Sequence, residues 1–118
     1  VVSLLFADPS LATRDMAEAL LRYKRLDGVD AALKAIIAAN FEGGKQHQAN
    51  PDDWKTVAAP LLVLWGAEDR IIPSAQIDRA PPTAKKEVLP GAGHLPHLEK
   101  AEAVNALLAA HIGAAAEA

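Results

Sequence analysis

The pattern of hydrophobic and polar residues divides the chain into a helical first half and a second half that contains strands. Apolar residues recur at helical spacing over residues 13–25 and again over about 30–40. Residues 1–6 are apolar and predict the end of a further helix. Residues 41–50 have no periodicity and contain Gly43-Gly44, so we expect a mobile loop there.

The second half contains a stretch without an alternating polar face. All residues from Leu61 to Trp65 are apolar, which is typical of a strand covered on both sides in a parallel sheet. We expect a second short strand over 85–89, reached through a helix over 75–80 that Ser74 caps. A final helix is predicted from about residue 96 to 112.

The order of these elements predicts an α/β fold in two parts. Residues 1–59 form a helical layer and a connecting helix that begins at Asn50-Pro51-Asp52-Asp53, and residues 60–118 form a βαβα unit with parallel strands. Two parallel strands do not make a stable sheet alone, because both faces and both edges need cover. We therefore expect the chain to begin in mid-protein, to be part of a larger domain, and to self-associate or partly unfold by itself.

One acidic and one basic group follow the two predicted strands. Asp69 lies on a short loop after Gly66, and His94 ends a glycine-containing loop. Functional groups of α/β sheets gather at the carboxyl ends of strands. A histidine suits general-base catalysis near neutral pH, and an ionised aspartate fixes its tautomer. Asp69 and His94 are thus candidates for two members of a Ser–His–Asp triad.

The two motifs together resemble the closing half of the α/β-hydrolase family. The first runs from Trp65 to Pro73 and the second from Gly91 to Glu99. In that family the triad follows the chain order Ser, Asp, His, so the resemblance implies that Asp69 is the acid, His94 is the base and the helical first half is a lid. The chain departs from the family pattern in its serines, because none lies in a Gly-x-Ser-x-Gly sequence. These serines are Ser3, Ser10 and Ser74. The resemblance therefore implies that the nucleophile and the oxyanion-hole loop lie upstream.

A narrower resemblance rests on the first half. Residues 4–10 and 21–29 resemble the hydrolase-like C-terminal domain of the dihydrolipoyllysine acetyltransferase subunit of acetoin dehydrogenase complexes. It implies acetyl transfer between a lipoyl group and coenzyme A, within a cytoplasmic multienzyme complex, and an inactive segment when the rest of the domain is missing. Two alternatives stay open: ester or C–C bond hydrolysis on the same machinery, and a non-catalytic assembly module.

Composition excludes several other functions. The net charge is −3 with no basic stripe, which argues against a nucleic-acid partner. The absence of cysteine excludes disulfides and thiolate metal sites within this chain. No apolar run approaches the roughly 20 residues that a membrane span needs.

Further residues have weaker claims on a role. Glu68 is an alternative to Asp69 as the acid, and Glu99 is expected to cap or form an ion pair at the start of the last helix. His97 and His94 have the spacing of a metal pair, but no third ligand is evident, so we expect no metal. Coenzyme A phosphates could bind a basic cluster at the end of the first helix, formed by Arg22, Lys24 and Arg25. Structural or solvated roles are expected for His47, His111, Trp54 and Trp65.

Overall fold

The first half of the chain contains an arm formed by two helices, which together span residues 14–40. The computed structural model describes residues 1–47, 50, 53 and 56–116 of the 118. Helix α1 spans Arg14–Lys24 and helix α2 spans Val29–Asn40, as the periodicity predicted. The side chain of Thr13 caps α1 by accepting a hydrogen bond from the backbone of Met16 at 3.2 Å.

Two short 3-10 helices precede this arm, where the sequence predicted the end of an α-helix. They are η1 over Val2–Leu5 and η2 over Pro9–Leu11. The Asp8 side chain accepts a hydrogen bond from the backbone of Ser10 and so starts η2. Between the two helices lies Phe6, whose exposed fraction is only 2%. This buried residue anchors residues 1–11, the N-terminal segment, to the rest of the molecule.

A small β-hairpin follows α2, where a loop without secondary structure was predicted. Strands β1, Phe41–Glu42, and β2, Lys45–Gln46, pair in antiparallel fashion. Gly43 and Gly44 have φ angles of 56° and 77°, the left-handed conformation that two-residue hairpin turns require. The helix predicted from Asn50, together with Trp54, lies largely outside the described residues.

The second half is organised by two parallel strands, as predicted. Strand β3, Leu62–Gly66, pairs with β4, Lys85–Leu89, so that Gly66 lies opposite Leu89. Their connection contains η4, Ser74–Arg79. This element is a 3-10 helix instead of the predicted α-helix, and its N-cap is Pro73, with no hydrogen bond from a capping side chain.

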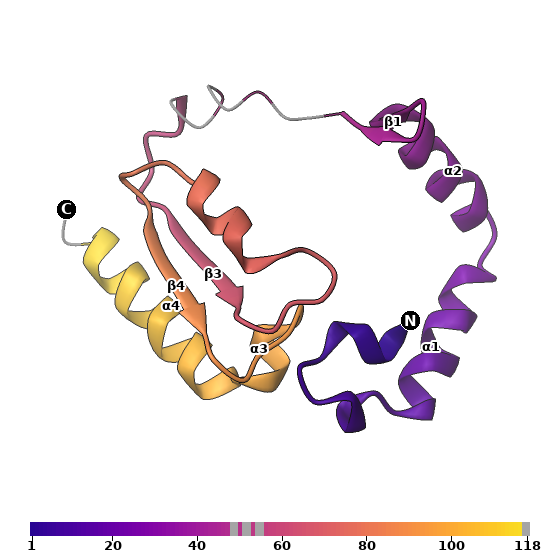
Figure 1. The fold of residues 1–118 in the computed structure, drawn as a ribbon, viewed down its shortest axis with the longest axis horizontal. Helices are drawn as coiled ribbons and strands as arrows, with labels where there is room; N and C mark the ends of the chain where they lie inside the picture. The colour runs from indigo at the N-terminus through magenta and orange to yellow at the C-terminus, as the bar shows by residue number, and fades with distance from the viewer. Residues whose placement is uncertain (48–49, 51–52, 54–55, 117–118) are drawn as a thin grey trace.

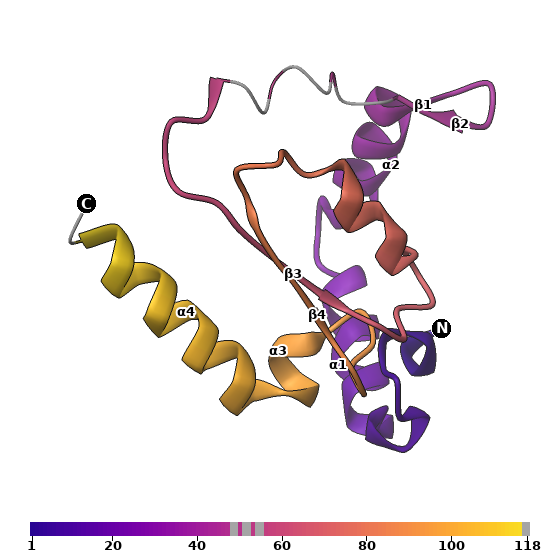
Figure 2. The same ribbon diagram turned by 60° about the vertical axis from the view of Figure 1, so that its left-hand side comes forward.

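The C-terminal part consists of two helices instead of the single predicted one. Helix α3 spans Pro96–Glu99 and α4 spans Ala101–Ala116. They are separated at Lys100, whose backbone angles of φ −132° and ψ 44° are not helical. Helix α4 lies on one side of the β3–β4 pair and η4 on the other (Figure 2). No helix in the described part of the chain has both the length and the apolar character to cross a membrane.

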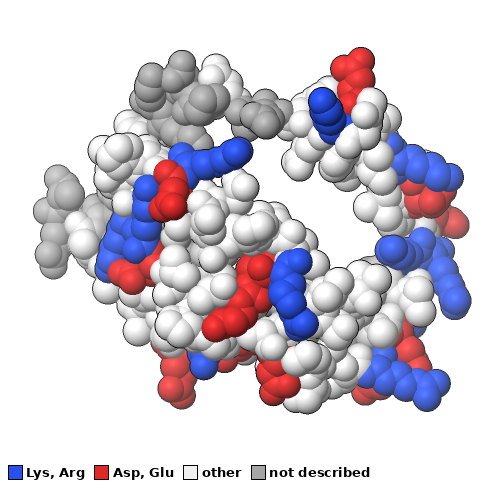
Figure 3. Space-filling view, in the orientation of Figure 1, with Lys and Arg blue, Asp and Glu red and all other residues white. Residues whose placement is uncertain are grey.

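The described residues bury little apolar surface. The radius of gyration is 17.0 Å, against about 13.5 Å for a compact domain of this length. The helical arm stands away from the β3–β4 unit and leaves an open space (Figures 1 and 3), and neither α1 nor α2 has a buried residue. The buried hydrophobic residues are Phe6, Ile77, Ala80, Ala84, Ala92 and Val104. The strand pair and the arm thus present apolar faces that other segments can cover.

We expect the 118 residues, expressed alone, to run larger than a monomer on size-exclusion chromatography with light scattering. Large side chains such as Ile36, Ile37 and Leu21 are more than half exposed, and the edges of a two-stranded parallel sheet are open to pairing. Lengthening the chain by about 150 upstream residues, an ordinary domain size, should restore a defined oligomer. A stable, compact monomer of the 118 residues would contradict this expectation.

Candidate active site

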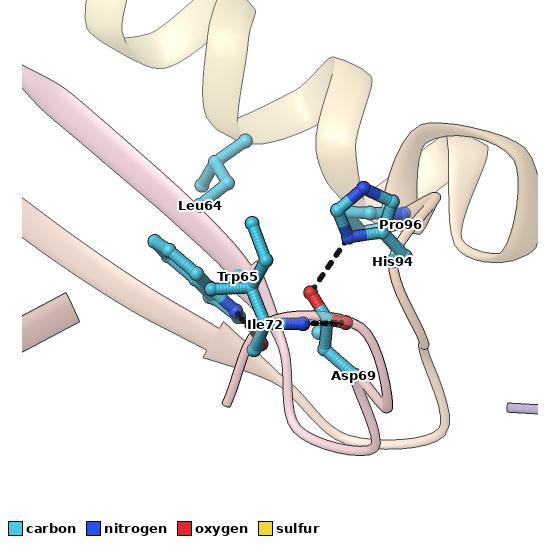
Figure 4. Close-up of a pocket in the computed structure, with 7 residues that line it drawn as sticks. Leu64, Trp65, Asp69, Ile72, His94 and Pro96 are labelled. Carbon is cyan, nitrogen blue, oxygen red and sulfur yellow. Dashed lines mark hydrogen bonds and ion pairs between the residues drawn. The ribbon is translucent and has the colours of Figure 1, made fainter. Parts of the chain in front are cut away.

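The carboxyl ends of β3 and β4 bring Asp69 and His94 together. Asp69 follows β3 by three residues and His94 follows β4 by five. Their side chains point toward each other, with His94 Nδ1 2.9 Å from Asp69 Oδ2 (Figure 4). The aspartate side chain is 4% exposed and the histidine side chain 30%. The acid is therefore sequestered, while the imidazole keeps a solvent-accessible side.

The carboxylate of Asp69 is fixed by its own loop. Its Oδ1 accepts hydrogen bonds from the backbone N–H groups of Ile71 at 2.8 Å and Ile72 at 2.9 Å. Burial alone raises the pKa of Asp69, but the hydrogen bonds from Ile72, His94 and Ile71 and the charge of His94 lower this pKa by more. The net result is a pKa below the ordinary value of 3.8, so Asp69 is ionised at neutral pH.

Two loops touch through their backbones: the loop that carries Asp69, residues 67–73 (the acid loop), and the loop that carries His94, residues 90–95 (the histidine loop). The N–H of Ala67 donates to the carbonyl of Leu89, and the N–H of Glu68 donates to the carbonyl of Ala92, each at 3.0 Å. A Cβ added to Gly66 would lie 1.9 Å from the carbonyl oxygen of Gly93. Only glycine at position 66 allows this close approach, which sets the distance between the catalytic candidates.

Glu68 binds the histidine loop through its side chain. Its Oε2 accepts hydrogen bonds from the N–H groups of Gly91 at 2.9 Å and Ala92 at 3.2 Å. Glu68 was considered as an alternative acid, but its carboxylate lies on this backbone instead of on the imidazole. The structure therefore favours Asp69 as the partner of His94.

A pocket of about 200 Å³ opens beside the Asp69–His94 pair. It is lined by Leu64, Trp65, Gly66, Asp69, Ile72, His94 and Pro96. The indole Nε1–H of Trp65 donates to the carbonyl of Ile72 at 3.1 Å (Figure 4). Trp65, expected only to pack, thus closes the acid loop and forms a wall of the pocket. With Nδ1 engaged by Asp69, the Nε2 of His94 is the nitrogen left to exchange a proton with a reacting group.

The other polar candidates lie apart from this pair. His97 is exposed on α3, His111 is half-buried on α4, and His47 lies 3.7 Å from the carboxylate of Glu42 after the hairpin. Among the residues described, no three His, Asp or Glu side chains are grouped as a metal site would require. The basic cluster is exposed at the end of α1 and comprises Arg22, Lys24 and Arg25.

Two residues near the site have contacts that the sequence did not reveal. Glu99 was expected to act at a helix start, but it binds backbone N–H groups of the N-terminal segment and of Gly93. Arg70, for which no role was predicted, donates to backbone carbonyls of the same segment. Apart from Gly93, their partners are main-chain atoms distant in sequence, so no residue pattern marks them.

Comparison with known proteins agrees with the fold expected from the sequence. The model of the alpha/beta hydrolase family matches residues 2–107. The chain belongs to this family. The fold predicted from the two motifs is thereby confirmed, as the part of an α/β hydrolase that carries helices and two parallel strands.

Curated relatives confirm the narrower resemblance. The chain is 47% identical over 113 residues to the dihydrolipoyllysine-residue acetyltransferase component of the acetoin cleaving system of Cupriavidus necator, which covers 96% of this chain and 30% of the relative. The protein of the same description from Pseudomonas putida is 46% identical over 103 residues, covering 86% and 26% respectively. The chain therefore spans less than a third of the length of these relatives.

Solved structures of the family share the fold. A meta-cleavage product hydrolase from Pseudomonas fluorescens IP01 superimposes with a TM-score of 0.78 at 20% identity, covering 95% of this chain and 43% of that chain. A serine hydrolase from the polyaromatic hydrocarbon-degrading bacterium Cycloclasticus zankles gives a TM-score of 0.69 at 27% identity, covering 91% and 40%. The chain thus corresponds to about two fifths of these hydrolases.

Proposed function

We propose that this chain supplies the acid and the base of a Ser–His–Asp acyltransferase. The observation that carries the proposal is the 2.9 Å contact between His94 and Asp69 at the carboxyl ends of adjacent parallel strands. An ionised, buried carboxylate on Nδ1 leaves Nε2 free to act as general base. The serine nucleophile and the oxyanion hole belong to sequence outside these 118 residues.

In the proposed mechanism, His94 exchanges protons with both the nucleophile and the leaving group. Nε2 takes the proton of the serine hydroxyl as its oxygen attacks the acetyl carbonyl of an acetyl-dihydrolipoyl thioester. The C–S bond breaks, and Nε2 returns the proton to the departing thiolate. The thiol of coenzyme A then attacks the acyl-serine, giving its proton to His94, and the serine oxygen leaves and is reprotonated. Asp69 stays ionised and stabilises the imidazolium in both halves of the cycle.

The substrate class is inferred from the curated relatives. Both are acetyltransferase components of an acetoin cleaving system, so a lipoyl-bound acetyl group and coenzyme A are the proposed donor and acceptor. The exposed basic cluster at the end of α1 is a candidate to bind the phosphates of coenzyme A. A cytoplasmic dehydrogenase complex is the proposed setting.

An acceptor assay tests the proposal. The full-length protein should convert acetyl-dihydrolipoamide and coenzyme A into acetyl-coenzyme A, and chromatographic product analysis should show little free acetate while coenzyme A is present. Formation of acetate alone, at a rate independent of coenzyme A, would show a hydrolase instead. Water would then take the place of the thiol in the second half of the same cycle.

Hydrolysis by the same Ser–His–Asp machinery is the second candidate function. The 27% identity to a serine hydrolase of the same fold favours it, and the Asp69–His94 pair serves either reaction. A non-catalytic assembly role is the remaining alternative. It would follow if the full-length sequence lacked a serine at the strand-to-helix elbow.

A further inference from the structure

A single peptide group of the N-terminal segment is held by Arg70, on the loop that carries Asp69, and by Glu99, on helix α3 directly after the loop that carries His94. The carbonyl oxygen of Phe6 and the N–H of Ala7 belong to the same peptide bond. Arg70, next to Asp69 in the sequence, binds the carbonyl, and Glu99, five residues after His94, binds the N–H. The segment that leads into the helical arm is therefore attached to the loops that carry the acid and the base.

Arg70 makes the contact on the acid side. Its Nη2 donates to the carbonyl of Phe6 at 2.7 Å and to that of Ser3 at 3.1 Å. Hydrogen bonds from a charged donor are stronger than those between neutral groups. Because both bonds come from one nitrogen, a lysine ammonium could make part of the same contact.

Glu99 makes the contact on the histidine side. Its Oε1 accepts from the N–H of Ala7 at 2.7 Å and from that of Asp8 at 3.3 Å, while its Oε2 accepts from the N–H of Gly93. One carboxylate thus joins the N-terminal segment to the residue directly before His94. A neutral amide could accept from only one of these two sides, because its other terminus is a donor.

The peptide also lies directly against the histidine loop. A Cβ added to Gly93 would be 2.6 Å from the nitrogen of Ala7 and 2.8 Å from the carbonyl carbon of Phe6. Phe6 is 2% exposed and Ala7 is half-buried, so the peptide is packed as well as bonded. A shift of this segment must therefore move Gly93 and, with it, His94.

Helix α1 lines a pocket together with the same segment. An apolar pocket of about 280 Å³ lies between the N-terminal segment, α1 and α3. It is lined by Val2, Leu5, Phe6, Met16, Ala19, Leu20, Tyr23, Leu95 and Leu98. The position of the helical arm is thereby connected, through residues 3–8, to the residues beside His94.

We propose that Arg70 and Glu99 are positioning residues that set the geometry of the Asp69–His94 pair through the Phe6–Ala7 peptide. The proposal rests on the proposed function of that pair. Neither side chain takes part in proton transfer. Their effect is to keep the histidine loop and the acid loop in register with the helical arm, and a displacement of about 1 Å at such a site can lower turnover about 100-fold.

The test compares Glu99→Gln and Arg70→Met with matched controls in the full-length protein. The controls are Glu102→Gln on α4 and Arg79→Met on η4, both at exposed positions. Hydrogen exchange of the Ala7 amide or of the Gly93 amide should accelerate roughly tenfold or more in Glu99→Gln, because the single amide oxygen can accept on only one of the two sides. The NMR resonance of the His94 Nδ1 proton should shift or broaden in both test variants and stay unchanged in both controls.

Turnover measurements complete the test. In Glu99→Gln and Arg70→Met, kcat should fall about 10- to 100-fold at temperatures where circular dichroism shows the variants folded, and Arg70→Lys should recover part of the loss. Their double variant should lose less than the product of the single losses, because both changes release the same peptide. Faster exchange of either amide with an unchanged His94 resonance and unchanged kcat would overturn the positioning role.

The measurements distinguish failure of the positioning role from failure of the proposed acyltransferase function. Absence of turnover in the unaltered full-length protein would reject the acyltransferase function. The His94 resonance and the exchange rates of the Ala7 and Gly93 amides would still decide the positioning role, because none of them requires a substrate. Unaltered exchange of both the Ala7 and the Gly93 amides in Glu99→Gln would overturn the contact itself, because a glutamine can keep only one of the two sides.

Discussion

Replacing His94 by alanine in the full-length protein is expected to lower kcat about 10⁴-fold or more, with the protein still folded. In the proposed mechanism the imidazole moves protons between the serine, the leaving group and the acceptor, and alanine offers no replacement. Because the side chain is 30% exposed and lies at the end of a loop, its removal leaves the β3–β4 pair intact. Steady-state kinetics with acetyl-dihydrolipoamide and circular dichroism measure the two effects.

The matched control for this change is His97→Ala. His97 is exposed and lies three residues further on, so its loss should change kcat less than twofold, the range of ordinary surface substitutions. Near-normal activity of His94→Ala would remove His94 from the mechanism. An equal loss in both variants would indicate that the helix start, and not the imidazole, is required.

Replacing Asp69 by asparagine is expected to lower kcat by about 10⁴-fold through the tautomer of His94. The amide oxygen can still accept from Ile71 and Ile72, so the acid loop keeps its shape. The amide nitrogen then faces Nδ1 of His94 and donates to it, which places the ring proton on Nε2. A protonated Nε2 cannot accept the serine proton. Asp78→Asn, at an exposed position of η4, is the control in the same kinetic assay.

The same Asp69→Asn variant should lose stability in a pH-dependent way. The folded-state pKa of Asp69 lies below the ordinary value of 3.8, so the unfolded chain binds more protons between these two values. The stabilisation from the ionised side chain is therefore present above pH 3.8 and disappears as the pH falls through the lowered pKa. Urea unfolding should show the difference between the two proteins at neutral pH and a shrinking difference in acid. A difference that grows in acid would contradict the assigned ionisation.

The strand pair and the contact between Asp69 and His94 were predictable because each leaves a local signal. Five consecutive apolar residues ending in Gly66 identify a strand covered on both faces, and parallel strands place the residues after them at the same edge. This topology is enough to expect Asp69 and His94 to meet. For the same reason, the sequence predicted the contact between Asp69 and His94 more accurately than it predicted where the helices begin and end.

The missed features lack such signals. The hairpin at Phe41–Gln46 has strands of two residues, too short for alternation to be visible, and only its Gly43-Gly44 turn marks it. The break at Lys100 interrupts a helix whose apolar spacing continues across it, so the periodicity predicts one helix. Arg70 and Glu99 bind backbone atoms, and backbone groups are the same at every position of a sequence.

The number of residues between two contacting groups determines how much chain entropy is lost when the contact forms. The Asp69–His94 contact spans 25 residues, while Glu99 reaches Ala7 across 92. Closing the longer loop costs about 1 kcal/mol more in chain entropy than closing the shorter one. The acid–base pair therefore belongs to the part of the chain that can assemble first and open last, and the attachment of the helical arm is the more easily lost of the two. The Ala7 amide is accordingly the sensitive reporter of early opening in this molecule.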